Sequence, residues 1–203
     1  MTNKQRAFHI KAMMIFFLSF FCLVSQAQNA DIQILKNLST HRSPSDNDFN
    51  RFISKTAPYI SVGVPILMYG VGLINHDKDL QRNSIQIGIA VGVTVAETYA
   101  LKYIVNRPRP YNKYPELTHV ETENTPSFPS GHSSSAFALA TSLSLNYPKW
   151  YVIVPSMAWA GLTGYSRMYL GVHYPTDVLA GAVLGVGTSW LTWKVNKALQ
   201  RRK

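Results

Sequence analysis

The segment Ser-Arg-Met-Tyr-Leu-Gly-Val-His-Tyr-Pro-Thr-Asp, residues 166–177, joins two apolar stretches in the C-terminal part of the 203-residue chain. Asp177 follows His173 by four residues, within reach of its ring, and Pro175 suits the first turn of a helix. A carboxylate that binds one ring nitrogen fixes the tautomer and leaves the other nitrogen free to attack. The segment therefore predicts a nucleophilic histidine where two helices meet.

Two polar patches precede this segment: Lys-Tyr-Ile-Val-Asn-Arg-Pro-Arg-Pro at residues 102–110 and Pro-Ser-Gly-His at residues 129–132. With the first segment they place three cations, Lys102, Arg109 and Arg167, at the expected outer ends of different helices. Arginine offers a planar fork that binds two phosphate oxygens, and lysine a compact point charge. The expected ligand is a phosphoryl group.

The second patch is expected to begin a helix. Free backbone N–H groups at Ser130 and Gly131 would point toward an anion, and glycine lets the backbone come close. His132 is the natural acid, able to protonate a departing alkoxide and then to activate the water that cleaves a phospho-histidine. In-line displacement needs positioning and charge stabilisation, which these groups supply. The patches hold no carboxylate cluster suited to Mg²⁺ or Zn²⁺, so neither a metal nor another cofactor is expected.

The composition favours a membrane protein with polar ends. Apolar residues make up 46% of the chain and charged residues 15%, against roughly 25% charge in soluble domains. The net charge is +10, but no nucleic-acid motif or aromatic-interleaved basic stripe is present. The positive charge is therefore assigned to membrane orientation and phosphate binding, and no nucleic-acid partner is expected.

Apolar runs predict an all-α, membrane-embedded bundle. Five spanning helices are expected in the mature chain, at residues 57–75, 84–105, 132–147, 150–165 and 175–197. Several runs are shorter than about 20 residues and need their semi-polar flanks to complete a span. Residues 106–131, rich in Pro, Asn, Tyr and Thr, are expected to form a loop.

The N-terminal region has the pattern of a signal peptide. A basic start, an apolar run at residues 12–24 and the small residues Ser25 and Ala27 favour cleavage after Ala27. The alternative is an uncleaved sixth membrane helix; Cys22 is interpreted as an apolar position of this run. Residues 28–56 are expected to form an amphipathic surface segment with a break at residues 41–44, and residues 57–203 the main domain.

Charge asymmetry predicts the orientation. With residue 28 outside, Lys78, Arg82, Lys149 and the basic C-terminus all fall on the cytoplasmic side. The polar patches fall on the other side, so the site is expected to face the periplasm from a bacterial inner membrane.

Other polar residues are given structural roles. Arg107 is interpreted as a charge at the outer rim of the site. Glu97 is expected to pair with a neighbour such as Lys102. Surface positions are expected for His41, His76 and His119.

The three patches together resemble the signature of the type 2 phosphatidic acid phosphatase (PAP2) superfamily, Lys-x6-Arg-Pro, Pro-Ser-Gly-His and Ser-Arg-x5-His-x3-Asp. Every fixed position matches, and the helix pattern extends the resemblance over residues 57–195. The resemblance implies a helical bundle and no metal requirement. It also implies a nucleophile at His173 supported by Asp177, and phosphate-binding roles that fall on Lys102, Arg109, Ser130, Gly131, His132 and Arg167.

The expected activity is hydrolysis of a phosphomonoester or diphosphate of a membrane lipid through a phospho-histidine intermediate. Undecaprenyl diphosphate, phosphatidylglycerophosphate, phosphatidic acid and lipid A all fit, and the sequence does not choose among them. The rival interpretation is a soluble periplasmic acid phosphatase. A vanadium-dependent haloperoxidase and a non-enzymatic membrane scaffold are weaker alternatives, since the chain is small and its signature is intact.

Overall fold

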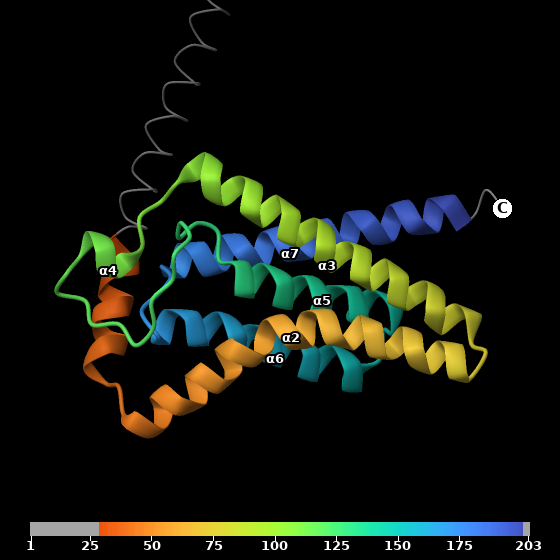
Figure 1. Ribbon diagram of the computed structural model, residues 1–203, viewed down its shortest axis with the longest axis horizontal. Helices are drawn as coiled ribbons and strands as arrows, with labels where there is room; N and C mark the ends of the chain where they lie inside the picture. Colours follow the sequence, from red (N-terminus) through yellow and green to blue (C-terminus); the bar gives the residue numbers. More distant parts are fainter. Residues whose placement is uncertain (1–28, 201–203) are drawn as a thin grey trace, which may run out of the picture.

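The computed structural model describes residues 29–200, and every regular element within them is a helix (Figure 1). A first helix covers residues 29–40. The others are α2 (Pro44–Ile74), α3 (Lys78–Val105), α4 (Pro110–Lys113), α5 (Gly131–Asn146), α6 (Trp150–Tyr169) and α7 (Pro175–Gln200). The all-α prediction is confirmed. The predicted signal peptide lies outside the described residues.

Local sequence sets the helix limits. The Ser43 side chain accepts a hydrogen bond from the Asp46 N–H at 3.2 Å, and Pro44 occupies the first turn, so α2 begins at the predicted break. Asp77 caps α3 in the same way. Asn106 ends α3 in the left-handed conformation, with φ of 46°.

Two helices extend beyond their predicted limits. α2 runs without interruption through residue 57, where a surface segment was expected to give way to a spanning helix. α6 continues to Tyr169, so Ser166 and Arg167 lie in its last turn instead of in the following connection. A cation is favourable there because the carbonyl ends of a helix carry partial negative charge.

α5 lies at the centre of the bundle and packs against α2, α3, α6 and α7. Small residues allow its close approach to α7: a Cβ added at Gly181 would lie 2.6 Å from the Ser130 carbonyl oxygen. One at Gly185 would overlap the Ser134 carbonyl oxygen and lie 2.8 Å from the Ala138 nitrogen. Contact through small residues is typical of helices packed within membranes.

Three of the described helical stretches are long and apolar enough to cross a membrane: α2, Lys78–Lys113, which contains α3, and α7. α5 has 16 residues, fewer than the roughly 20 of a typical span, and a large buried share of small and hydroxylated side chains. Five spans remain a prediction.

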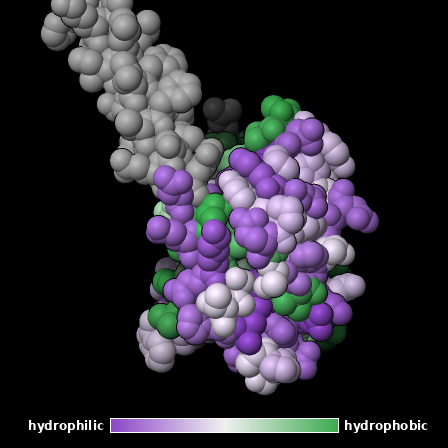
Figure 2. Space-filling model, turned by 90° about the vertical axis from the view of Figure 1, so that its left-hand side faces the viewer, coloured by the Kyte–Doolittle hydropathy of each residue, from purple (hydrophilic) through white to green (hydrophobic). Residues whose placement is uncertain are grey.

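The bundle has two distinct ends (Figure 1). The long loop before α5 and the α6–α7 connection lie at one end, which we call the site end. Figure 2 shows that this end is largely hydrophilic. The α2–α3 turn, with Lys78 and Arg82 beyond it, lies at the opposite end together with the C-terminus.

Candidate active site

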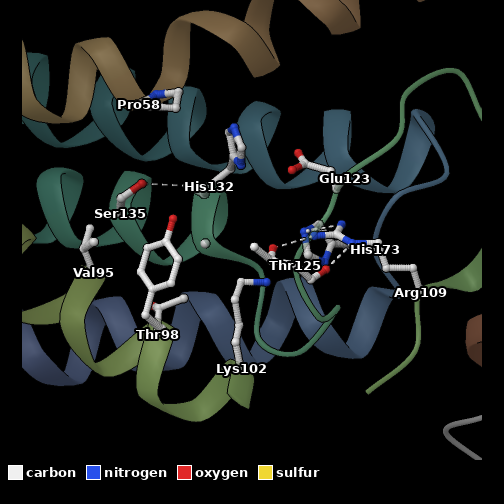
Figure 3. A pocket seen from close by; sticks show the side chains of 12 residues that line it. Pro58, Val95, Thr98, Lys102, Arg109, Glu123, Thr125, His132, Ser135 and His173 are labelled. Carbon is white, nitrogen blue, oxygen red and sulfur yellow. Dashed lines mark hydrogen bonds between the residues drawn. The ribbon is translucent and has the colours of Figure 1, made fainter. Parts of the chain in front are cut away.

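The three polar patches meet at the site end, around a cavity of about 200 Å³ (Figure 3). Lys102 reaches it from the last turn of α3, Gly131 and His132 from the first turn of α5, and His173 from the α6–α7 connection. Arg109, just before α4, completes the cationic wall. An adjoining polar pocket contains Arg167 and shares His132 with the first. Residues far apart in sequence therefore form one continuous site.

His173 is buried between Arg109 and Asp177, with 2% of its surface exposed. Arg109 Nη1 lies 3.3 Å from Nε2 of the ring, and Asp177 Oδ2 lies 3.5 Å from Nδ1. Because a guanidinium can only donate, Nε2 must carry the lone pair and Nδ1 the proton. Burial lowers the pKa of His173 to about 3; the hydrogen bond with Asp177 opposes this shift, and Arg109 adds to it. At neutral pH the ring is neutral, and the lone pair of Nε2 accepts a hydrogen bond from Arg109.

Asp177 is held by donors on both oxygens. Oδ1 accepts from Arg107 Nη1 at 2.6 Å, and Oδ2 accepts from Ser127 Oγ at 2.5 Å and from the Tyr174 N–H at 3.1 Å. An ionised carboxylate can accept all three bonds at once. Its orientation toward His173 is therefore fixed by the surrounding protein.

Backbone carbonyls fix two of the cations. Lys102 Nζ donates to the Pro126 carbonyl at 2.5 Å. Arg109 donates from Nε to the Thr125 carbonyl and from Nη1 to the Val172 carbonyl, both at 2.8 Å. Neutral acceptors hold these side chains without cancelling their charge, so both remain attractive to an anion.

Arg167 is held differently, by two carboxylates. It donates to Glu121 at 3.3 Å, to Glu123 and to Ser54 of α2. Its side chain is 1% exposed, and its Nε has no hydrogen-bond partner among the described residues. A buried N–H without a partner is costly, and a phosphoryl oxygen would satisfy it. Neither glutamate could be predicted from the sequence, because no periodicity fixes the conformation of their loop.

The start of α5 differs in one respect from expectation. The Ser130 N–H was predicted to be free for an anion, but it donates to the Asp177 carbonyl at 3.0 Å. The bond ties the first turn of α5 to the first turn of α7. Ser130 is fully buried and does not line the cavity, and its hydroxyl accepts a hydrogen bond from Ser133 at 2.9 Å. Gly131 and His132 both line the cavity from the first helical turn, where backbone N–H groups have no partner within the helix.

Gly131→Ala should lower activity without lowering stability. The new Cβ would lie 3.7 Å from Thr98 Cγ2 and 4.0 Å from Lys102 Cε, which are ordinary contacts. The methyl group would instead take space in the cavity next to the lysine. We expect a raised KM and lowered kcat for an aryl phosphate, with an unchanged unfolding temperature in detergent. Unchanged kinetics would show that the phosphoryl group does not approach Gly131.

Two residues have partners other than those predicted. Arg107 is not a free rim charge: it forms ion pairs with Asp177 at 2.6 Å and with Asp31 at 3.1 Å. Glu97 does not pair with Lys102; it accepts a hydrogen bond at 2.5 Å from Thr188 of α7. Exposure is confirmed for His41, His76 and His119. In residues 29–200, His, Cys, Asp and Glu side chains form no group of three that could hold a metal.

Comparison with known proteins places the chain in a family. The model of the PAP2 superfamily matches residues 84–201. An undecaprenyl-diphosphatase of Sulfolobus acidocaldarius is 29% identical over 85% of this chain and 82% of its own length. A lipid A 4'-phosphatase of Bacteroides thetaiotaomicron is 31% identical over 57% of this chain and 56% of its own length.

Two solved structures have a fold similar to that of this chain. The transmembrane PAP2-type phosphatidylglycerolphosphate phosphatase of Bacillus subtilis has a TM-score of 0.74 and 26% identity, with 95% of this chain and 98% of that chain covered. A bacterial vanadium-dependent iodoperoxidase shares the fold alone, with a TM-score of 0.65 and 18% identity over 81% of this chain and 48% of its own.

The chain belongs to the PAP2 superfamily. It is a phosphoric ester hydrolase and a multi-pass helical membrane protein, as the motif and composition predicted. The soluble acid phosphatase considered from sequence does not fit these relatives.

Proposed function

We propose that this enzyme removes a phosphate from a phosphomonoester or diphosphate of a membrane lipid, and that the lipid chain lies between α2 and α3. One observation carries the proposal: the cationic cavity adjoins a long apolar groove. Val95 lines both, and Pro58 of α2 lines the cavity at the same side. A soluble phosphate ester would have no use for such a groove.

The groove has the dimensions and chemistry of a chain-binding surface. Its volume is about 480 Å³, and α2 and α3 supply its walls. Val62, Ile66 and Ile85 expose 52%, 64% and 51% of their surface there. Apolar exposure of this extent is favourable against hydrocarbon and unfavourable against water. A lipid whose phosphate reaches the cations can therefore leave its chain in the bilayer or along this groove.

The proposed chemistry uses groups of this chain alone. Nε2 of His173 attacks phosphorus in line, while Lys102, Arg109 and Arg167 stabilise the charge on the equatorial oxygens. His132 gives a proton to the departing oxygen and then takes one from the water that cleaves the phospho-histidine. The three cations supply the charge that Mg²⁺ supplies in other phosphoryl-transfer enzymes, so we expect activity to survive EDTA and vanadate to inhibit.

The lipid assignment can be tested with a substitution that fills the groove. Gly92 lines it, and a Cβ added there meets no atom within 4 Å. Gly92→Phe should therefore fold normally and obstruct a lipid chain. We expect a large loss of activity on a lipid phosphate and little loss on a short aryl phosphate. The panel should contain undecaprenyl diphosphate, phosphatidylglycerophosphate, phosphatidic acid and lipid A.

A matched control is available on the same pair of helices. Gly63 of α2 also has no atom within 4 Å of an added Cβ but does not line the groove. Gly63→Phe should leave both activities unchanged. If Gly92→Phe hydrolysed every lipid of the panel at the unaltered rate, the chain would not lie in this groove.

We further propose that the site faces the periplasm from the inner membrane. The basic connections at Lys78, Arg82 and the C-terminal helix lie at the end opposite the site (Figure 1), and short basic connections stay in the cytoplasm. A reporter phosphatase that is active only outside the cytoplasm should be inactive when fused after residue 203. Fused within residues 112–124, it should be active. The reverse pattern would place catalysis in the cytoplasm.

A further inference from the structure

Arg107 forms ion pairs with two acidic side chains, Asp177 and Asp31. Asp177 belongs to the family signature, but Asp31 does not. Arg107 Nη1 donates to Asp177 Oδ1 at 2.6 Å, and its Nη2 donates to Asp31 Oδ2 at 3.1 Å. The side chains of Asp177 and Asp31 are 0% and 2% exposed. The guanidinium carbon lies 3.8 Å from the centre of the Tyr174 ring. Arg107 is thus held in one orientation by contacts on three sides.

Asp31 also binds the first turn of the helix that carries Asp177. Its Oδ1 accepts from the Thr176 N–H at 2.9 Å, and its Oδ2 accepts from the Thr176 hydroxyl at 2.6 Å. A carboxylate at this position satisfies a free N–H of the helix start and interacts favourably with its partial positive charge. The helix at residues 29–40 therefore supplies a cap for α7 from outside its own chain segment.

This arrangement decides which oxygen of Asp177 faces the nucleophile. Arg107 occupies Oδ1, so Oδ2 is left for Ser127, for the Tyr174 N–H and for His173 Nδ1. Rotation of the carboxylate would break the ion pair with Arg107 inside the protein, where an unpaired charge is costly. The other cations near His173 do not replace this contact, because Arg109 approaches the opposite ring nitrogen.

We propose that Arg107 and Asp31 are positioning residues for the nucleophile: Arg107 holds the Asp177 carboxylate against Nδ1 of His173, and Asp31 holds Arg107. The helix at residues 29–40 then belongs to the catalytic apparatus. The inference rests on the nucleophilic role proposed for His173.

If Asp31 only anchored its helix, any other change that loosens this helix should lower kcat by the same factor. The chain offers a control, because Arg42 anchors the same region without contact to Asp177. It donates to the Tyr169 carbonyl at 2.7 Å and to the Thr118 carbonyl at 2.6 Å. Leu35 adds an apolar anchor against Leu117, so the helix should stay bound when Asp31 is changed.

The test measures kcat and KM of the full-length protein in detergent on a soluble aryl phosphate, with inorganic phosphate as a competitive inhibitor. Loss of an outer partner of a metal ligand typically costs about 10–100-fold, and by analogy we expect Arg107→Gln to lower kcat by a factor of that order. KM and phosphate inhibition should hardly change, because Lys102, Arg109 and Arg167 are untouched. Arg107→Lys keeps the charge but loses the fork, and should recover part of kcat.

Asp31→Ala should lower kcat less than Arg107→Gln, and the double variant should be no worse than Arg107→Gln alone. If the kcat losses of Asp31→Ala and Arg107→Gln were additive, or if Arg42→Gln lowered kcat as much as Asp31→Ala, Asp31 would only anchor its helix. An unaltered kcat in Arg107→Gln would overturn the proposal. If that variant fails to fold, Arg107→Lys and Asp31→Ala decide by the same criteria. His173→Ala is assayed alongside: substantial residual activity there would refute the nucleophile itself, whereas an inactive His173→Ala beside an unaltered Arg107→Gln would refute only the positioning role.

Discussion

His173→Ala should be inactive on every substrate. The variant lacks the ring nitrogen proposed as nucleophile, Nε2, which the contacts with Arg109 and Asp177 fix as the unprotonated position. No phospho-enzyme can form, whatever the leaving group. The measurement is phosphate release from a lipid phosphate and from p-nitrophenyl phosphate by equal amounts of folded protein. Substantial activity on either would end the covalent mechanism.

His132→Ala should instead lose activity to an extent that depends on the substrate. General acid catalysis is worth about 10²–10⁴-fold, and a poor alkoxide leaving group needs the proton, whereas p-nitrophenolate scarcely does. The variant should therefore be far slower on a lipid phosphate than on the aryl ester, and it should accumulate phospho-histidine if water activation also fails. Equal losses on both substrates, with no trapped intermediate, would remove His132 from the acid role.

Gly185→Ala should destabilise the whole bundle. Its new methyl group would overlap the Ser134 carbonyl oxygen and lie 2.8 Å from the Ala138 nitrogen, both on the backbone of α5. Backbone cannot rotate aside, so α7 must move away from α5. Overpacking of this kind costs about 1–3 kcal/mol. Activity should fall as well, because the movement separates the starts of the two helices that carry the catalytic groups.

Gly187→Ala is the matched control for this prediction. It lies one half-turn further along α7, where an added Cβ meets no atom within 4 Å. Alanine is favoured over glycine inside a helix by roughly 1 kcal/mol, so the unfolding temperature in detergent should stay or rise. If both variants behaved alike, the tight contact between α5 and α7 would not matter for stability.

The chemistry-bearing residues could be placed from sequence because their spacing follows the helix. Lys102 is one turn before the end of α3, and Gly131 and His132 begin α5, so apolar periodicity brings them to the same end. The break before Pro44 was equally readable, because capping is a local signal. The membrane span predicted for α5 stays a prediction, since this helix has 16 residues and many buried small side chains.

The supporting residues could not be predicted for a different reason. Arg107 meets Asp31 across 76 positions, with α2 and α3 between them, and Arg167 meets Glu123 across 44, with α5 and most of α6 between them. The charge pattern of a sequence does not show which of two distant side chains will meet in the folded chain. The ion pairs that orient the site are therefore tertiary in origin, while the groups that react are fixed by local spacing.

The glycine contacts also divide the molecule mechanically. α5 and α7 touch through backbone at Gly181 and Gly185, whereas a Cβ at Gly164 of α6 would meet the side chain of Val178 of α7 at 2.8 Å. The contact between α5 and α7 is therefore stiff, because no side chain lies between the two backbones at these glycines. α2 and α3 line the apolar groove together and are joined by a short turn at the end opposite the site, so they diverge toward the site end (Figure 1). A lipid chain that enters this groove would therefore separate α2 and α3 at their open ends, while the glycine contacts keep α5 in place against α7, whose starts carry His132 and Asp177.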